Sequence, residues 1–271
     1  MQINNVSAYM PKCAFFIHLF KAIPQLIDKH LGQIKIDKAF ATFSKMTCLY
    51  LLTLFTEEYI NVTVHRTSYD GTSKELLRTN GGPWGLSSVE TAFTTWLTEV
   101  FGKDNINEWK DGCCDEYHDL MQSIKVKMRS IRFSLDETEK KTFSVGTLLS
   151  YTRKSSQDLT THFSQMKLKE NVAIVRNKVR VPTQIVRSWF DEPMNKGIRH
   201  IADVLAMPAM NDVDTILLVG EFAECPLVQE TVEEAFRSKK IVIPSVPSCA
   251  VLLGAVLFGH QCNPMWKKYF K

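Results

Sequence analysis

The chain has few of the features that identify secreted, metal-binding or membrane proteins. Its seven cysteines form no Cys-x-x-Cys pair, and the adjacent Cys113 and Cys114 suit neither a common disulfide nor a zinc site. Reduced cysteines of a cytosolic protein are the simplest interpretation, so we expect a cytoplasmic location and no metal site. We find no signal-peptide pattern, and the apolar stretches at residues 13–27 and 46–55 fall short of the roughly 20 residues of a membrane span.

A strong charge of either sign is also missing. The sequence has 33 Lys and Arg against 29 Asp and Glu, a net charge of +4. This mild excess argues against a polyanion partner, so we expect neither a nucleic-acid nor a membrane partner. The length of 271 residues and the 45% hydrophobic content are typical of a globular protein with a sizeable core.

The clearest pattern lies near the carboxyl terminus. Residues 214–220 form an apolar run that stops at a glycine, Pro226 can open a helix to about residue 238, and residues 239–244 read as a second buried strand. A strand–helix–strand unit predicts parallel strands. Ligands of such sheets bind at the carboxyl ends of the strands, which here are residues 220–225. An apolar helix over residues 247–259 is expected to follow.

The first half of the chain predicts an antiparallel group of strands. Residues 50–55 are a continuous apolar run, and residues 60–65 alternate apolar with polar side chains, as in a half-buried strand. The Asp70-Gly71 pair has hairpin-turn chemistry, and residues 74–79 return as the next strand.

Helices are predicted between and after these strands. A glycine-rich loop at residues 81–85 precedes a helix with capping-box spacing from Ser87 to Glu90. The buried face of this helix is predicted to carry Val89, Phe93, Trp96, Leu97 and Val100. Residues 109–133 read as one long helix that becomes basic, and residues 172–181 as a hairpin. A helix after this hairpin should break at Pro193. Strands alternating with helices predict an α/β class.

Four separated segments resemble one known family. VDTILLVGEFAECPLVQETVEEAF at residues 213–236 and VIPSVPSCAVLLGAVLFG at residues 242–259 are similar to the divergent type-12 branch of the 70-kDa heat-shock protein family. So are VAIVRNKVRVPTQIVRSWF at residues 172–190 and VTVHRTSYDGTSKELLRTNGGPWGLSSVETAF at residues 62–93. The segments occur in the family's order, and the likeness covers roughly residues 50–260.

The resemblance implies the actin-like ATPase (ribonuclease H-like) fold, in which two lobes close on ATP and magnesium. This chain would supply mainly the second lobe, a mixed sheet with flanking helices, without a counterpart of the first lobe's phosphate loop. Residues 1–49 would be an unassigned N-terminal extension and residues 50–271 the lobe. Its core would comprise residues 50–100 and 172–260, with a helical and sheet insertion at residues 103–171.

An adenine-nucleotide site is implied as well. The family pattern Gly-Gly-Phe-Ala-Glu-x-Pro is matched from residue 220 onward, with only the second glycine changed, to Glu221. In the family these residues lie against the ribose and adenine, bordered by a glycine loop and a basic helix. The implied nucleotide-binding residues are Gly220, Glu221, Phe222, Ala223, Glu224, Pro226, Gly82, Gly85, Lys127 and Arg129. For Gly220 an ordinary strand-end turn remains the alternative, and for Arg129 a solvated cation.

The phosphate side of this implied site is altered. The family's second phosphate loop, Asp-x-Gly-Gly-Gly-Thr-x-Asp, falls without gaps on residues 54–61, and every functional position differs. Glycines let backbone N–H groups approach phosphate oxygens, whereas Glu57 and Glu58 bring side chains and negative charge. We therefore expect no catalytic residue, weak binding of ATP or ADP with magnesium, and no useful hydrolysis.

Three functions are compatible with these observations. The first is a nucleotide-binding, chaperone-like stress protein of the type-12 branch with hydrolysis lost. The second is a non-catalytic interaction or regulatory scaffold that no longer binds nucleotide. The third, an active ATPase or small-molecule kinase, is disfavoured by the changed loop at residues 54–61. Protein partners are expected in the first two cases.

Overall fold

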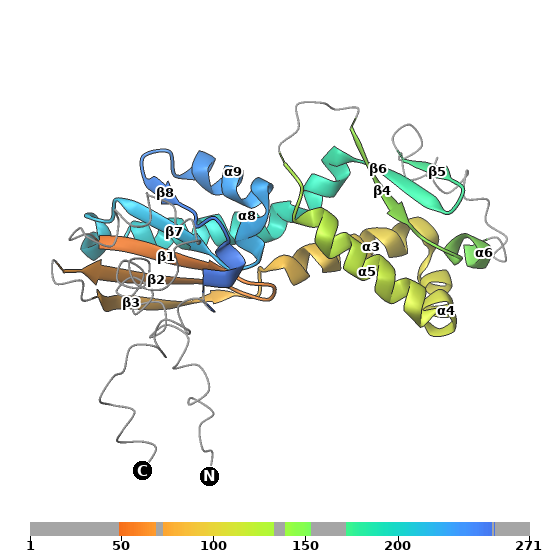
Figure 1. The fold of residues 1–271 in the computed structure, drawn as a ribbon, viewed down its shortest axis with the longest axis horizontal. Helices are drawn as coiled ribbons and strands as arrows, with labels where there is room; N and C mark the ends of the chain where they lie inside the picture. Colours follow the sequence, from red (N-terminus) through yellow and green to blue (C-terminus); the bar gives the residue numbers. More distant parts are fainter. Residues whose placement is uncertain (1–48, 69–72, 133–138, 153–171, 251, 253–271) are drawn as a thin grey trace, which may run out of the picture. The chain divides into compact units, whose positions relative to one another are not determined.

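The computed structural model describes residues 49–68, 73–132, 139–152, 172–250 and 252. It divides into two compact units (Figure 1). The first unit contains the described residues up to Gly82, His200–Glu224 and those from Val232 onward, and the second contains Pro83–Arg199 and Cys225–Thr231. The expected N-terminal extension, the Asp70-Gly71 turn and most of the helix predicted over residues 247–259 lie outside the described residues.

A five-stranded mixed sheet forms the first unit. Its strands are β1 (Leu49–Phe55), β2 (Ile60–Thr67), β3 (Ser73–Gly82), β7 (Thr215–Val219) and β8 (Lys240–Val242). The order is β3-β2-β1-β7-β8, with antiparallel pairing among the first three strands and parallel pairing from β1 through β7 to β8. The predicted α/β class and the parallel strand–helix–strand unit are confirmed.

The central strands β1 and β7 are buried on both faces. All five residues of β7 are buried, and so is β1 except for half-buried Leu54. Such strands read as continuous apolar runs, which is why the sequence revealed them. The connecting helix α9 (Pro226–Ala235) and strand β8 are both shorter than expected, because a turn that Lys239 closes onto Phe236 separates them.

Strand β2 is not half-buried as its alternation predicted. Thr63, His65 and Thr67 are buried, as are the apolar residues of this strand. Polar and apolar side chains therefore alternate along β2, but exposed and buried ones do not. His65 is 0% exposed and stacks on Tyr50 with ring centroids 5.4 Å apart. Its Nε2 lies 2.9 Å from Thr63 Oγ1, while its Nδ1 has no hydrogen-bond partner among the residues that the structure describes.

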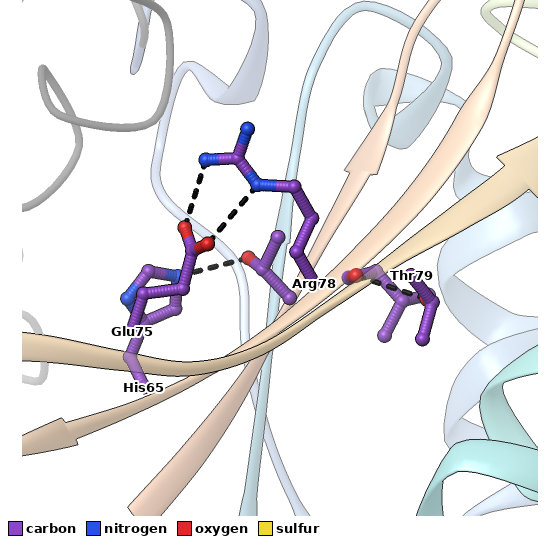
Figure 2. Close-up of polar contacts among 6 residues, drawn as sticks. His65, Glu75, Arg78 and Thr79 are labelled. Atoms are coloured by element: carbon purple, nitrogen blue, oxygen red, sulfur yellow. Dashed lines mark hydrogen bonds and ion pairs between the residues drawn. The ribbon is translucent and has the colours of Figure 1, made fainter. Parts of the chain in front are cut away.

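Strand β3 adds polar contacts beside His65 (Figure 2). Arg78 donates two hydrogen bonds to the Glu75 carboxylate, at 3.0 and 2.9 Å. Thr79 donates to the Val62 carbonyl at 3.1 Å, and its hydroxyl lies 2.9 Å from His200 Nε2. Burial lowers the pKa of His65 to about 4, an effect that Glu75 opposes and Arg78 reinforces. The ring is therefore neutral at physiological pH.

The second unit combines helices with a small sheet. Its elements are α3 (Leu86–Phe101), α4 (Lys103–Gly112), α5 (Cys114–Met128), β4 (Lys140–Ser144), α6 (Leu148–Thr152), β5 (Ala173–Val175), β6 (Lys178–Pro182) and most of α8 (Thr183–Leu205). The three strands are antiparallel in the order β4-β6-β5, and the hairpin predicted over residues 172–181 is confirmed.

Four aromatic rings form the centre of this unit. Phe93 lies 5.3 Å from Trp189 and 5.7 Å from Phe143, and Trp96 lies 5.5 Å from Trp189, measured between ring centroids. Tilted and edge-on contacts of this kind add to the energy of burying the rings. They join α3, β4 and α8, and they confirm the buried face predicted for α3.

Three helix predictions are wrong. The long helix expected over residues 109–133 is two helices separated at Cys113, because Trp109 is buried and its Nε1 donates to Glu116 at 3.2 Å across the break. Helix α8 continues through Pro193, which removes one backbone hydrogen bond, because buried residues on both sides hold the helix in place.

The capping box is the third error. Helix α3 begins at Leu86 with Gly85 as its N-cap and no side-chain cap, and Ser88 Oγ instead donates to the Pro83 carbonyl at 2.7 Å. The glycine-rich loop is also shorter than expected, since Gly81 and Gly82 belong to β3. No helix within the described ranges has the length and apolar character needed to span a bilayer.

His65 should make the protein less stable as the pH falls from about 6.5 to about 4. Its pKa is lowered from 6.5 to about 4 in the fold, so in this window the unfolded chain binds the proton more readily. Each pH unit of acidification should then remove up to about 1.4 kcal/mol from the free energy of unfolding. Urea titrations of the wild type and His65→Gln across this window measure the difference.

The matched control for this experiment is His118→Gln, which changes an exposed histidine of α5. This variant should keep the wild-type dependence on pH. An equally steep loss of stability in His65→Gln would show that other groups cause it.

Candidate functional site

The carboxyl ends of β1 and β7 form one edge of the first unit's sheet. The two strands pair in parallel from Tyr50 with Thr215 to Leu54 with Val219, so both end at this edge. A turn over residues 56–59 follows β1, and Gly220 with the short helix η2 (Phe222–Glu224) follows β7. The predicted ligand loop therefore lies beside the altered phosphate-loop segment, as expected for a parallel pair.

The turn after β1 is closed by its own residues. The Thr56 amide donates to the Tyr59 carbonyl at 2.9 Å, and the Tyr59 amide donates to Thr56 Oγ1 at 2.8 Å. The Thr56 hydroxyl also donates to the Tyr59 carbonyl at 2.8 Å. Between them lie Glu57, half-buried, and Glu58, exposed. The turn thus presents two carboxylates and uses these two backbone amides internally.

Gly220 adopts a conformation that only glycine tolerates well. Its φ is +102°, and a Cβ at this position would lie 2.1 Å from the Phe55 carbonyl oxygen of β1. Its amide donates to the Pro247 carbonyl at 2.9 Å. Packing within the first unit therefore requires a glycine here independently of any ligand, in agreement with the strand-end-turn alternative.

The remainder of the loop turns two side chains into the core. Phe222 and Ala223 are fully buried, and the Phe222 ring lies 6.2 Å from that of Phe55. Glu221 and Glu224 are half-buried, and the Glu224 amide donates to the Glu221 carbonyl at 3.2 Å. The loop can therefore offer a ligand the side chains of its two glutamates and its backbone, rather than the apolar pair.

Gly82 lies at this same edge. It pairs with Ile60, the first residue of β2 after the turn, and is buried. The candidate residues Gly220, Glu221, Phe222, Ala223, Glu224 and Gly82 are thus all in the first unit, on loops or strand ends of one edge. Gly85, Pro226, Lys127 and Arg129 lie in the second unit.

A cavity of about 490 Å³ lies in the second unit on α3, just after Gly85. Its volume is within the range of small-molecule sites. It is lined by Ser87, Glu90, Thr91, Thr94, Thr95, Thr98, Glu99 and Met121. The four threonine hydroxyls donate to backbone carbonyls one turn earlier, at 2.8–2.9 Å, which leaves their methyl groups toward the cavity. The wall is therefore mainly apolar, with two carboxylates.

The basic helix α5 places one cation, Lys125, beside this cavity. Lys127 donates to the Thr142 carbonyl and lies 5.1 Å from the centre of the Phe143 ring. Burial and nearby Lys178 lower its pKa. Lys125 instead lies 3.4 Å from Glu90, a cavity residue. The sequence analysis did not identify Lys125 as a site residue. The available signal is that Lys125 lies four residues after Met121, so the two share one face of α5.

The remaining candidates have structural positions of their own. Arg129 is the half-buried C-cap of α5, and its amide donates to the Lys125 carbonyl at 3.3 Å. Pro226 opens α9, whose next amide, that of Leu227, donates to the Ile131 carbonyl at 2.9 Å. Within the residues that the structure describes, no three His, Cys, Asp or Glu side chains are grouped so that they could hold a metal ion.

Comparison with known proteins finds similarity to one group. Heat shock 70 kDa protein 12A of Mus musculus and that of Homo sapiens are each 30% identical to this chain over 207 residues. Heat shock 70 kDa protein 12B of Homo sapiens is 29% identical over 218 residues. Each match covers 74% of this chain and 30% of the relative, so the chain spans about 30% of the length of these curated relatives. No family model matches the sequence.

Replacing Gly220 by alanine should destabilise the first unit. The left-handed φ and the overlap with the Phe55 carbonyl should together lower the free energy of unfolding by about 2–4 kcal/mol. Gly112→Ala is the matched control, because its added methyl group meets only the side-chain end of Tyr151 and should cost no more than about 1 kcal/mol. Chemical denaturation of both variants tests this, and equal effects would contradict it.

Proposed function

Because this chain is a divergent relative of the type-12 70-kDa heat-shock proteins, we propose that it has their family's actin-like ATPase fold and binds adenine nucleotides through the nucleoside end, without hydrolysing them. The mixed five-stranded sheet supports this fold. The observation that carries the proposal is the contrast between two neighbouring loops at one sheet edge. The loop after β7 keeps the family's nucleoside pattern, and the turn after β1 has lost the phosphate pattern.

The nucleoside side supports binding of a base and sugar. From residue 220 the loop retains the family's sequence except at Glu221, and its backbone is fixed by the Gly220 to Pro247 hydrogen bond. A loop that is held in place independently of ligand loses little entropy on binding. The second unit by itself has an apolar cavity on α3 beside the Lys125–Glu90 pair.

The phosphate side does not fit a magnesium-bound triphosphate. Glu57 and Glu58 add negative charge to the turn, and the Thr56 and Tyr59 amides already have acceptors within it. An anion at this position would meet repulsion and few donors. The described residues also include no group of three His, Cys, Asp or Glu side chains that could hold a metal ion.

Loss of hydrolysis follows from the same groups. Phosphoryl transfer depends on positioning and on neutralising the charge of the phosphates, and the turn at residues 56–59 supplies neither. The family's aspartate at the start of this loop is replaced by Leu54, whose side chain has no oxygen to order water. The chain is accordingly proposed to be a nucleotide-responsive, chaperone-like protein that acts by binding rather than by turnover.

A scaffold that no longer binds nucleotide is the second candidate. Glu221 favours it, because a half-buried side chain stands where the family has a glycine close to the ligand. In that case the fold would serve only to present surfaces to protein partners. Direct binding measurements distinguish the two functions.

Calorimetry on the full chain should detect adenosine and ADP with similar affinities, while ATP with magnesium should bind no more tightly. In a site that binds phosphates, ATP would gain most of its affinity from its phosphate groups. Here the turn carboxylates should cancel that gain. A much tighter complex with magnesium ATP would contradict the assignment of the turn, and no heat with any of the three ligands would leave the scaffold function.

Glu221→Gly should strengthen adenosine binding by about tenfold, equivalent to about 1.4 kcal/mol. Glu221 could hinder binding through its bulk or through its charge. Glu221→Gln separates these two effects, since it removes the charge but keeps a side chain of similar size. If bulk is the obstacle, only the glycine variant should improve binding, and if charge is the obstacle, both should. Unchanged affinity in both variants would remove Glu221 as the reason for weak binding.

A further inference from the structure

The small sheet of the second unit has one apolar and one basic face. Phe143, Val179 and Val181 are buried on the first face. The register pairs Thr142 with Arg180 and Ser144 with Lys178, which places these four side chains on the other face. Lys140 shares it, next to Arg180, because it pairs with Pro182. We call Lys140, Lys178 and Arg180 the basic sheet face.

These cations are exposed, and no carboxylate among the described residues neutralises them. Neither Lys140, Lys178 nor Arg180 forms an ion pair with any residue in the described parts of the protein. The neighbouring carboxylate of Glu139 is bonded at 2.6 Å to Lys141, whose strand position faces the other way. Arg176 adds a further exposed cation in the turn between β5 and β6.

One further cation lies near this sheet. Lys127 of α5 donates to the Thr142 carbonyl of β4 and lies over the Phe143 ring, and the charge of Lys178, after burial, contributes to lowering its pKa. Clustered cations with no acidic partner among the described residues raise the local potential and favour an anionic ligand. The Thr142 and Ser144 hydroxyls lie between the cations and can donate additional hydrogen bonds.

We propose that the basic sheet face binds an extended acidic segment of a partner polypeptide. Lys178 and Arg180 are two residues apart on one strand, so their side chains start about 6.6 Å apart. Alternate carboxylates of an extended peptide have the same spacing. The planar guanidinium of Arg180 matches a carboxylate in two-pronged geometry.

A polypeptide fits this face better than a nucleic-acid strand. Single-stranded nucleic acids bind where bases can stack on aromatic side chains, and the residues described on this face include none. The exposed apolar residue here is Val175, 42% exposed at the edge strand β5, which suits an aliphatic side chain between acidic residues. Each exposed ion pair is weak, so affinity requires several at once and should fall with salt.

The test measures binding of a fluorescently labelled peptide of alternating glutamate and threonine to the full chain at about 0.15 M salt. The double variant Lys178→Glu/Arg180→Glu should weaken binding at least tenfold. Lys178→Gln/Arg180→Gln should weaken it less, because it removes attraction without adding repulsion. Both positions are exposed, so thermal denaturation should show an unchanged fold.

The matched control is Lys74→Glu/Lys103→Glu, which changes the net charge equally at exposed lysines of β3 and α4, outside the small sheet. It should alter peptide affinity by less than about twofold. An equal loss of peptide affinity in the control would show that the net charge of the protein causes the effect, and it would overturn the proposal. So would absence of peptide binding, or tighter binding of polyuridylate or of phosphatidylserine vesicles that depends on the same two residues.

Discussion

The parallel pairing of β1 with β7 is the contact on which the candidate site depends. It joins strands that lie far apart in the sequence and brings their carboxyl ends to one edge of the sheet. The backbone after β7 passes so close to the Phe55 carbonyl that its first residue, Gly220, must be a glycine with a positive φ. The loops at this edge are therefore held in place by backbone packing rather than by a bound ligand.

Because backbone packing holds these loops without a ligand, their conformation does not depend on which side chains face a ligand. Gly220, Phe222 and Ala223 are retained for reasons internal to the fold, since one relieves a steric clash and two fill the core. Glu57, Glu58 and Glu221 are not buried, and their carboxylates would oppose an anionic phosphate. The packing of this edge therefore does not depend on whether it binds a nucleotide.

The distribution of charge is more informative than the total. A net charge of +4 suggested no polyanion partner. The structure gathers carboxylates at the sheet edge of the first unit and, on one face of the small sheet in the second, cations without an ion-pair partner among the described residues. The parallel pairing of β1 with β7 brings together the loops that carry the carboxylates, and the alternation along β4 and β6 places the cations on one face. The net charge of the whole sequence reveals neither the group of carboxylates nor the group of cations.

The sequence by itself determined the elements whose signal is local. The apolar runs of β1 and β7, the parallel strand–helix–strand unit, the buried face of α3 and the β5–β6 hairpin were all readable from spacing and turn residues. So was the candidate loop at Gly220. Only the tertiary structure decided the burial of His65, the continuity of α8 through Pro193, the break at Cys113, and the approach of Lys125 rather than Lys127 to Glu90. The reason is physical: periodicity reports how one segment distributes its polar and apolar side chains, whereas burial, helix continuity and ion pairing depend on what distant segments place against it.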